Sequence, residues 1–196
     1  MRIGFDIGGT KIAACGIGED GTILGQSRCR APRGDYPGTL EALRGLLEEV
    51  ESQAGATARC AGIGVPGNVD RDRGSLRLGN AWWLADKPFR DEAAAALDRP
   101  VRLANDADCF TLSEAMDGAG AGCHSVFGVI LGTGVGGGFA MDGGLVSGRS
   151  GVAGEWGHIP MPRGTPEELA RGPCSCGRHG CIETLLSGPS LARDFT

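Results

Sequence analysis

The same short pattern, an apolar strand that runs into a glycine-rich turn and out into a second strand, occurs once in each half of the chain. The first copy surrounds DIGGTK at 6–11 and the second surrounds LGTGVGGG at 131–138. The flanking strands are expected at 2–7, 11–17, 125–131 and 135–141. Neither turn has P-loop spacing, and a strand rather than a helix follows the second, which excludes a dinucleotide-binding fingerprint. The repeat predicts two lobes, each opened by one such hairpin.

Both turns offer groups that bind phosphate. Glycine brings the backbone N–H groups close to a ligand, and each turn also contains a threonine hydroxyl. Each turn taken alone could equally be a plain hairpin, and it is the pair that favours phosphate binding. The candidate residues are Gly8, Gly9, Thr10, Gly132, Thr133 and Gly134.

The remaining pattern predicts a mixed α/β fold. An amphipathic helix is expected over 38–53, where leucine and valine recur at three- and four-residue steps. A second helix is expected from its N-cap, Asn105, to a stop at Gly118. Further strands are expected near 22–29, 60–67, 101–104 and 144–148. We place the lobes at 1–118 and 119–196 and expect the second to be incomplete, since little chain follows residue 183 to cover its sheet.

Charge and hydropathy narrow the class of ligand. The formal net charge is −5 and there is no basic run, so neither nucleic acid nor a membrane surface is an expected partner. No apolar stretch approaches the roughly 20 residues that span a bilayer, and the start MRIGFDIGGTK does not resemble a signal peptide. We expect a cytoplasmic protein that binds a small neutral or anionic ligand and keeps its eight cysteines reduced.

Three cysteines lie close together in CSCGRHGC at 174–181. This spacing predicts a zinc site, because Cys174, Cys176 and Cys181 supply three thiolates and the intervening glycines let the loop turn. We expect His158 in GEWGH as the fourth ligand, since His179 is too close in sequence to complete the shell. Such a closed site would be structural. The alternative is a reduced loop without metal. The single cysteines are expected to be isolated core thiols: Cys15, Cys29, Cys60, Cys109 and Cys123.

Asp106 lies at the predicted start of the second helix, in NDAD at 105–108. Amide dipoles favour a carboxylate at this position, so the motif can be interpreted as helix capping alone. That interpretation accounts for Asn105 and Asp108 but leaves Asp106 to project from the helix start. A carboxylate held there can accept a proton from a sugar hydroxyl that attacks a phosphoryl group.

Six motifs together resemble the ROK family (repressors, open reading frames and sugar kinases) from residue 2 to about 188: DIGGTK, GIGVPGNVD, LANDADCFTLSEA, ILGTGVGGG, GVAGEWGH and CSCGRHGCIE. The resemblance implies an actin-like, ribonuclease-H-like fold of two lobes, with ATP and a hexose meeting in the cleft. PRGDYPGTLEAL, NAWWLADKPF and EWGHIPMP are most similar to bacterial fructokinases of the mannokinase type, which implies phosphorylation of a fructose- or mannose-like sugar at its 6-hydroxyl. FDIGGTKIA and ILGTGVGGG are equally similar to N-acetylglucosamine kinases, so that sugar or glucose is the alternative acceptor.

The resemblance also implies residue roles. It makes Asp106 the catalytic base, and it makes His158 and the three clustered cysteines the zinc ligands, in agreement with the spacing. Asp6 is our candidate for organising Mg²⁺ through water, although an exposed aspartate at a strand end would look the same. Lys11 is either a phosphate contact or a solvated strand lysine. The expected sugar contacts are Asn105, Glu155, His158 and Glu183, with Gly67 and Asn80 as lesser ones.

The motifs leave the adenine site, the tryptophan pair, the class of protein and the oligomeric state less sharply defined. Relatives of this type continue past the cysteine loop into helices and a further glycine motif, so no adenine-binding residue is assigned. Trp82 and Trp83 could flank the sugar, but adjacent residues on an extended segment face opposite ways, and at least one is expected in the core. The alternatives to a kinase are a sugar-sensing regulator and an inactive sugar-binding fragment. The resemblance also implies a possible homodimer.

Overall fold

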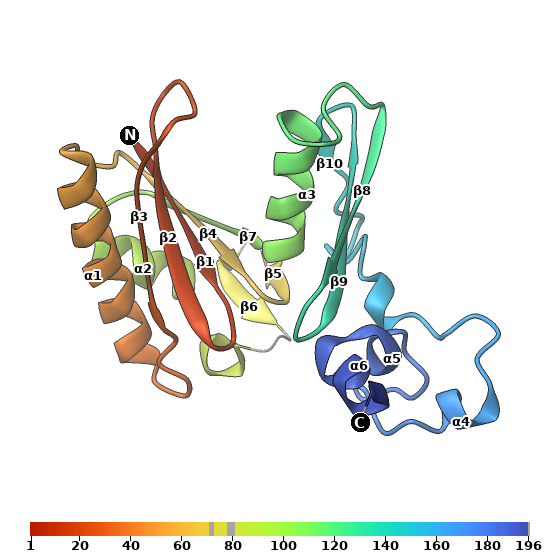
Figure 1. Ribbon diagram of the computed structural model, residues 1–196. Helices are drawn as coiled ribbons and strands as arrows, with labels where there is room; N and C mark the ends of the chain where they lie inside the picture. The colour runs from red at the N-terminus through yellow and green to blue at the C-terminus, as the bar shows by residue number, and fades with distance from the viewer. Residues whose placement is uncertain (71–72, 78–80, 196) are drawn as a thin grey trace. The chain divides into compact units, whose positions relative to one another are not determined.

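The structure is a computed structural model that describes residues 1–70, 73–77 and 81–195 (Figure 1). The chain divides into two compact units, Met1–Asp106 and Ala107–Thr196. The two units divide within the first turn of helix α3 (Asp106–Met116), whereas the predicted boundary between residues 118 and 119 lies just beyond the C-terminal end of this helix. This helix belongs mostly to the second unit because Thr111 packs against that unit's sheet, where a Cβ added at Gly128 would lie 2.0 Å from the Thr111 hydroxyl.

The first unit is built on a five-stranded sheet of order β3-β2-β1-β4-β7. Its strands are β1 (Arg2–Ile7), β2 (Lys11–Ile17), β3 (Ile23–Arg30), β4 (Ala61–Val65) and β7 (Val101–Asn105). β1 pairs antiparallel with β2 but parallel with β4, and β4 pairs parallel with β7. The carboxyl ends of β1, β4 and β7 therefore lie at one edge of the sheet.

Two helices cover one face of this sheet and close the core. Helix α1 (Tyr36–Ala54) confirms the helix predicted over 38–53, with Asp35 as its N-cap and Gly55 in the left-handed region at its end. Helix α2 (Phe89–Leu97), which the sequence analysis does not predict, packs beside α1. Ile3, Phe5 and Ile7 of β1 point into this core, each at most 4% exposed. The short strands β5 (Asn68–Asp70) and β6 (Ser75–Arg77) and the turn η1 (Trp82–Leu84) complete the described part of the unit.

The second unit contains an antiparallel sheet of β8 (Ser125–Leu131), β9 (Val135–Met141) and β10 (Gly144–Leu145), the last shorter than predicted. The turn η2 (Trp156–His158) packs on the face opposite α3. η2 lies so close to β9 that a Cβ at Gly157 would lie 2.0 Å from the carbonyl oxygen of Val135. Gly154, with a φ of 92°, also lies close to β9, since a Cβ there would be 2.6 Å from the carbonyl oxygen of Gly137. Several of the clustered glycines therefore serve backbone packing rather than a ligand.

Three short helices follow: α4 (Pro166–Leu169), α5 (Glu183–Leu186) and α6 (Gly188–Phe195). Phe127, Val129 and Leu131 of β8 are 43–55% exposed, which agrees with the expected incomplete second lobe. None of the helices in the described part of the chain combines the length and the apolar character that a bilayer crossing needs.

Candidate functional site

In the first unit, the predicted site residues gather at the carboxyl edge of β1, β4 and β7. Asp6 is exposed near the end of β1, and Asn105 ends β7 next to Asp106, the half-buried first residue of α3. The side-chain amide of Asn105 donates to the carbonyl of Gly67 at 3.0 Å, which joins two of the expected sugar contacts. Open α/β sheets commonly bind ligands at this edge.

The first glycine turn links β1 to β2 at the same edge. The N–H of Gly8 donates to the carbonyl of Lys11 at 2.9 Å and closes the turn, so this N–H serves the turn rather than a phosphate. The carbonyl of Thr10 accepts from the N–H of Ala31 at 3.0 Å, which ties the turn to the end of β3. The side chains of Thr10 and Lys11 are exposed. Gly9 and Thr10 therefore form the tip that a phosphate could approach.

The second glycine turn, Gly132–Gly134, links β8 to β9 in the second unit. It is closed in the same way, by the N–H of Gly132 donating to the carbonyl of Gly134 at 2.9 Å. A Cβ at Gly132 would meet nothing within 4 Å, so packing does not require glycine at this position. Open space beside a glycine is compatible with close approach of a ligand to the backbone.

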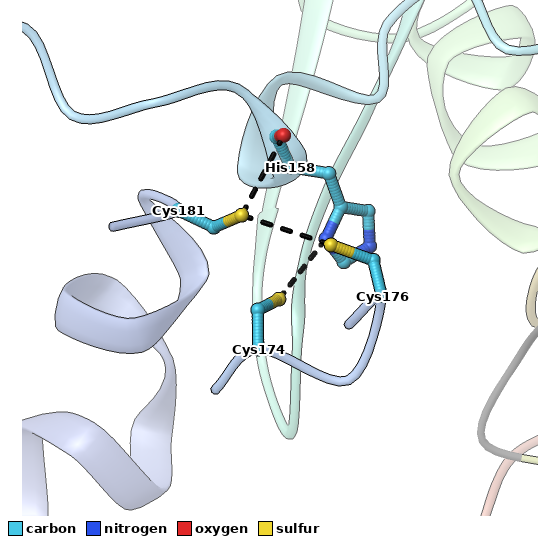
Figure 2. Close-up of side chains that lie close together, drawn as sticks. All are labelled: His158, Cys174, Cys176 and Cys181. Carbon is cyan, nitrogen blue, oxygen red and sulfur yellow. Dashed lines mark hydrogen bonds between the residues drawn. The ribbon is translucent and has the colours of Figure 1, made fainter. Parts of the chain in front are cut away.

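The four predicted metal ligands lie together in the second unit (Figure 2). The donor atoms of His158, Cys174, Cys176 and Cys181 all lie within 4.8 Å of one another. The Cys174 sulfur is 3.3 Å from His158 Nδ1, and the sulfurs of Cys176 and Cys181 are 3.7 Å apart. The exposed His179 is not part of this cluster, in agreement with the choice of His158 over His179.

The cluster fits a tetrahedral zinc ion. Zinc binds sulfur at about 2.3 Å, which separates two thiolates of a tetrahedron by about 3.8 Å. The observed 3.7 Å between Cys176 and Cys181 is close to this value. Burial raises the pKa of Cys174, and burial together with the neighbouring thiols raises the pKa of Cys181 to about 12. A cation is therefore needed to hold these two residues as thiolates at neutral pH.

Backbone pairing supports the metal cluster. The N–H of Met161 donates to the carbonyl of Gly180 at 2.7 Å, and that of Ile182 donates to the carbonyl of Ile159 at 3.1 Å. These bonds hold the segment after His158 beside the segment that contains Cys181. Gly177 and Gly180 both adopt positive φ, of 82° and 69°, which the tight loop requires.

The two predicted acidic sugar contacts lie on these segments. Glu155 is half-buried and immediately precedes η2. Glu183 begins α5, and its carboxylate accepts from the N–H of Val135 at 3.0 Å and from the hydroxyl of Ser175 at 2.8 Å. Neither Ser175 nor Trp156 is predicted from the sequence. The indole N–H of Trp156 donates to the carbonyl of Gly136 at 2.8 Å. Ser175 lies in the motif CSCGRHGCIE and Trp156 in GVAGEWGH, but no spacing rule marks either as a positioning residue.

Other predictions have mixed outcomes. Trp83 is 5% exposed and donates to the Thr39 hydroxyl at 3.0 Å, whereas Trp82 is 63% exposed, which confirms that at least one of the pair is in the core. Asn80 lies outside the described residues. No disulfide joins any of the eight cysteines, all of which lie in the described part of the chain, but the prediction of five single core thiols is wrong because none of the five is fully buried, although Cys29 packs against the core. Cys109 is exposed because it does not lie on the face of α3 that buries Ala107, Thr111 and Ala115, and Cys123 is exposed in the loop before β8; the other three are half-buried.

The sheets, the two glycine turns and the Cys₃His cluster define an α/β protein of the actin-like class. The family model described as "ROK family" matches residues 2–196. The chain belongs to the ROK family. Its fold is shared with the ROK hexokinase of Thermus thermophilus (TM-score 0.82, 35% identity, 100% of this chain and 63% of that one). It is also shared with a ROK family glucokinase of Streptomyces griseus solved with glucose and AMPPNP (TM-score 0.85, 34% identity, 98% and 59%).

Curated relatives are named N-acetyl-D-glucosamine kinase. The one from Yersinia pestis bv. Antiqua (strain Nepal516) is 40% identical over an alignment of 192 positions that covers 96% of this chain and 75% of that protein. The one from Escherichia coli (strain K12 / DH10B) is 43% identical over an alignment of 199 positions that covers 98% of this chain and 64% of that protein. This chain thus spans less than two thirds of the E. coli relative and of both solved structures.

Proposed function

We propose that this chain is the sugar- and phosphate-binding part of an ATP-dependent hexose kinase. The observation that carries the proposal is Asp106, held at the start of α3 beside Asn105 on the same sheet edge as the first glycine turn. A carboxylate at a helix start beside a phosphate-type turn suits proton transfer during phosphoryl transfer better than it suits binding alone. Family membership and the named relatives support the same reaction class.

In the proposed reaction Asp106 accepts the proton of the sugar 6-hydroxyl. The hydroxyl oxygen bonds to the γ-phosphorus of ATP, and ADP leaves. Asn105, Glu155, His158 and Glu183 orient the sugar, with Gly67 and Asn80 in lesser roles. The remaining amides and hydroxyls of the two glycine turns, with Lys11, hold the phosphates. Mg²⁺ would neutralise phosphate charge, and Asp6, exposed on β1 near the first turn, is the residue we propose to organise it.

We also propose that His158, Cys174, Cys176 and Cys181 hold a structural zinc ion. Nδ1 of His158 faces the thiols, which leaves Nε2 for a sugar hydroxyl. Four protein ligands leave no open position, so the ion would stabilise the loops rather than take part in the chemistry.

For the acceptor we favour N-acetylglucosamine, because the curated relatives at 40–43% identity carry that name. Fructose or mannose, which the sequence motifs favour, is the competing acceptor, and glucose is a third. A homodimer stays a prediction that light scattering after size-exclusion chromatography would test.

The decisive experiment measures ADP release by the full-length protein with a panel of hexoses, for the wild type and for Asp106→Asn. Loss of the base should lower kcat by roughly 10² to 10⁴ with little change in sugar affinity. Equal rates in the two proteins would end the case for Asp106. Sugar binding without ADP release in the wild type would instead indicate a sensor or an inactive sugar-binding protein.

A further inference from the structure

One carboxylate joins the predicted metal loop to the second glycine turn. The Oε2 atom of Glu183 accepts from the N–H of Val135, the residue directly after the turn, at 3.0 Å. The Oε1 atom accepts from the hydroxyl of Ser175 at 2.8 Å and lies 3.5 Å from the sulfur of Cys174. Glu183 therefore bridges the start of β9 and the cysteine loop, two segments that are far apart in the sequence.

The same stretch of chain also holds the other end of the turn. The N–H of Gly188, the first residue of α6, donates to the carbonyl of Gly132 at 2.8 Å. The backbone of Glu183 is fixed in turn, because its carbonyl accepts from the N–H of Ser187 at 3.2 Å and from the hydroxyl of Ser190 at 3.4 Å. Residues 183–188 thus contact both residues that flank the tip of the turn.

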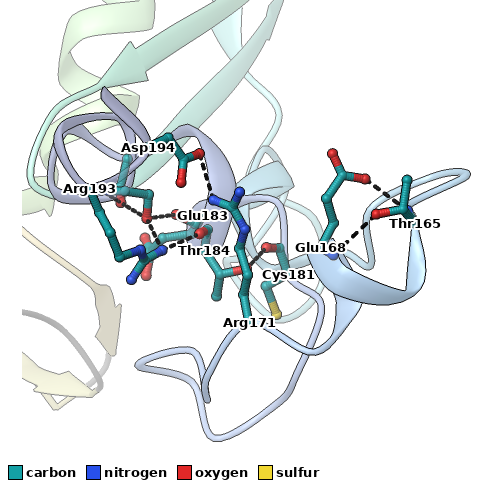
Figure 3. A network of polar contacts seen from close by, with 10 residues as sticks. Thr165, Glu168, Arg171, Cys181, Glu183, Thr184, Arg193 and Asp194 are labelled. Carbon is teal, nitrogen blue, oxygen red and sulfur yellow. Dashed lines mark hydrogen bonds and ion pairs between the residues drawn. The ribbon is translucent and has the colours of Figure 1, made fainter. Parts of the chain in front are cut away.

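Polar contacts stabilise this stretch from outside (Figure 3). Arg193 of α6 donates to the carbonyl of Thr184 at 3.2 Å. Arg171 pairs with Asp194 at 2.6 Å and joins α6 to the segment before the cysteine loop. Glu183 therefore lies in a pair of short helices, α5 and α6, that polar contacts hold in place.

The segment that carries the histidine ligand contacts the same strand. The indole N–H of Trp156 donates to the carbonyl of Gly136 at 2.8 Å. Gly157 packs directly on the carbonyl of Val135, where even a methyl group would not fit. Both segments that bear the proposed zinc ligands thus hold the strand that leaves the second turn, and the ion would fix one segment relative to the other.

We propose that Glu183 is a positioning residue that couples metal occupancy to the order of residues 132–136, and thereby to the affinity for the phosphates of ATP. The last step rests on the proposed function. When Cys174 is a thiolate it no longer donates to Glu183, so the Ser175 hydroxyl is the link from the metal loop. Without the metal ion, the cysteine loop is no longer held by its four ligands, so the Ser175 hydroxyl no longer fixes the Glu183 carboxylate. That carboxylate, which accepts from the N–H of Val135, is then positioned only by the backbone contacts of Glu183.

Amide hydrogen exchange measured by mass spectrometry on the full chain tests the coupling without any need for catalysis. In the wild type, removal of zinc with a chelator should speed exchange of the 132–138 amides by about tenfold, the equivalent of one lost hydrogen bond to a charged group. Glu183→Ala should exchange fast with or without zinc. Ser175→Ala, a milder change, should keep Val135 protected but make its exchange much less sensitive to zinc. Glu168→Ala, which breaks only the capping box of α4, is the matched control and should behave as wild type.

A kinetic split separates positioning from simple structural support. Ser175→Ala should raise KM for ATP several-fold and leave kcat at saturating ATP near wild type. The coupling is overturned if zinc removal speeds exchange equally in the wild type and in Ser175→Ala, if Glu183→Ala keeps Val135 protected, or if no zinc binds. A protein that shows the exchange pattern but transfers no phosphate would contradict the proposed function and leave the coupling intact.

Discussion

Gly157→Ala gives the sharpest test of how the second unit is packed. The added methyl group would lie 2.0 Å from the carbonyl oxygen of Val135 and 2.8 Å from its carbonyl carbon. Both are backbone atoms of a paired strand, so no side chain can rotate away, and β9 and η2 must separate by more than about 1 Å to restore an ordinary contact. Overpacking of this kind costs about 3 kcal/mol, which for a chain of this size lowers Tm by about 6–12 °C.

Thermal unfolding followed by circular dichroism, in the presence of zinc, measures the effect. Gly172→Ala is the control, because a Cβ at this position meets nothing within 4 Å. It should change the free energy of unfolding by no more than about 0.5 kcal/mol. The close packing of η2 on β9 would be refuted if the two variants unfolded within about 1 °C of each other, a difference well below the shift expected from overpacking.

Three further predictions concern charge, protons and the metal. Burial disfavours the Glu51 carboxylate, but the N–H of Ala58 and the Arg99 guanidinium, 2.6 Å away, outweigh it and lower the pKa of Glu51 below its usual value of 4.5. The stability that this carboxylate contributes should thus be present above pH 4.5 and lost as the pH falls through the lower pKa of the folded state. The free energies of urea unfolding of the wild type and of Glu51→Gln should therefore differ at pH 7 and converge in acid. Because the pKa values of Cys174 and Cys181 are raised, zinc binding at pH 7 should release at least two protons, and calorimetry in buffers of different ionisation enthalpy that found none would argue against thiolate ligation. Cys181→Ser should lower the zinc content found by elemental analysis, whereas Cys123→Ser, at an exposed single thiol, should leave it unchanged.

Local patterns in the sequence were sufficient for the elements whose signal is strong. The leucine spacing of α1 and the strand–turn–strand units around both glycine turns predict their elements to within a few residues. The cysteine spacing and His158 predict a cluster that the fold does bring together. In each case the information lies in residues close in sequence or in ligand chemistry that admits few partners.

The remaining features depend on contacts between distant segments. Helix α2 escapes prediction because four consecutive alanines leave little contrast between its faces, although Pro88 marks its start. Gly137 of β9 is required by the close approach of the η2 segment and of β8, and Gly138 by the close approach of α3, which no local pattern reveals. The hydrogen bond from Val135 to Glu183 likewise joins residues 48 positions apart, so a residue predicted to contact sugar also holds a glycine turn.

Phosphorus NMR of the reaction product tests the proposed function most directly. The full-length protein would be incubated with ATP, Mg²⁺ and N-acetylglucosamine, in parallel with its Asp106→Asn variant. We expect a sugar phosphomonoester signal that grows with the ADP signals in the wild type and is nearly absent in the variant. Equal phosphomonoester formation by both proteins, or release of inorganic phosphate alone across the hexose panel, would contradict phosphoryl transfer to a sugar with Asp106 as the base.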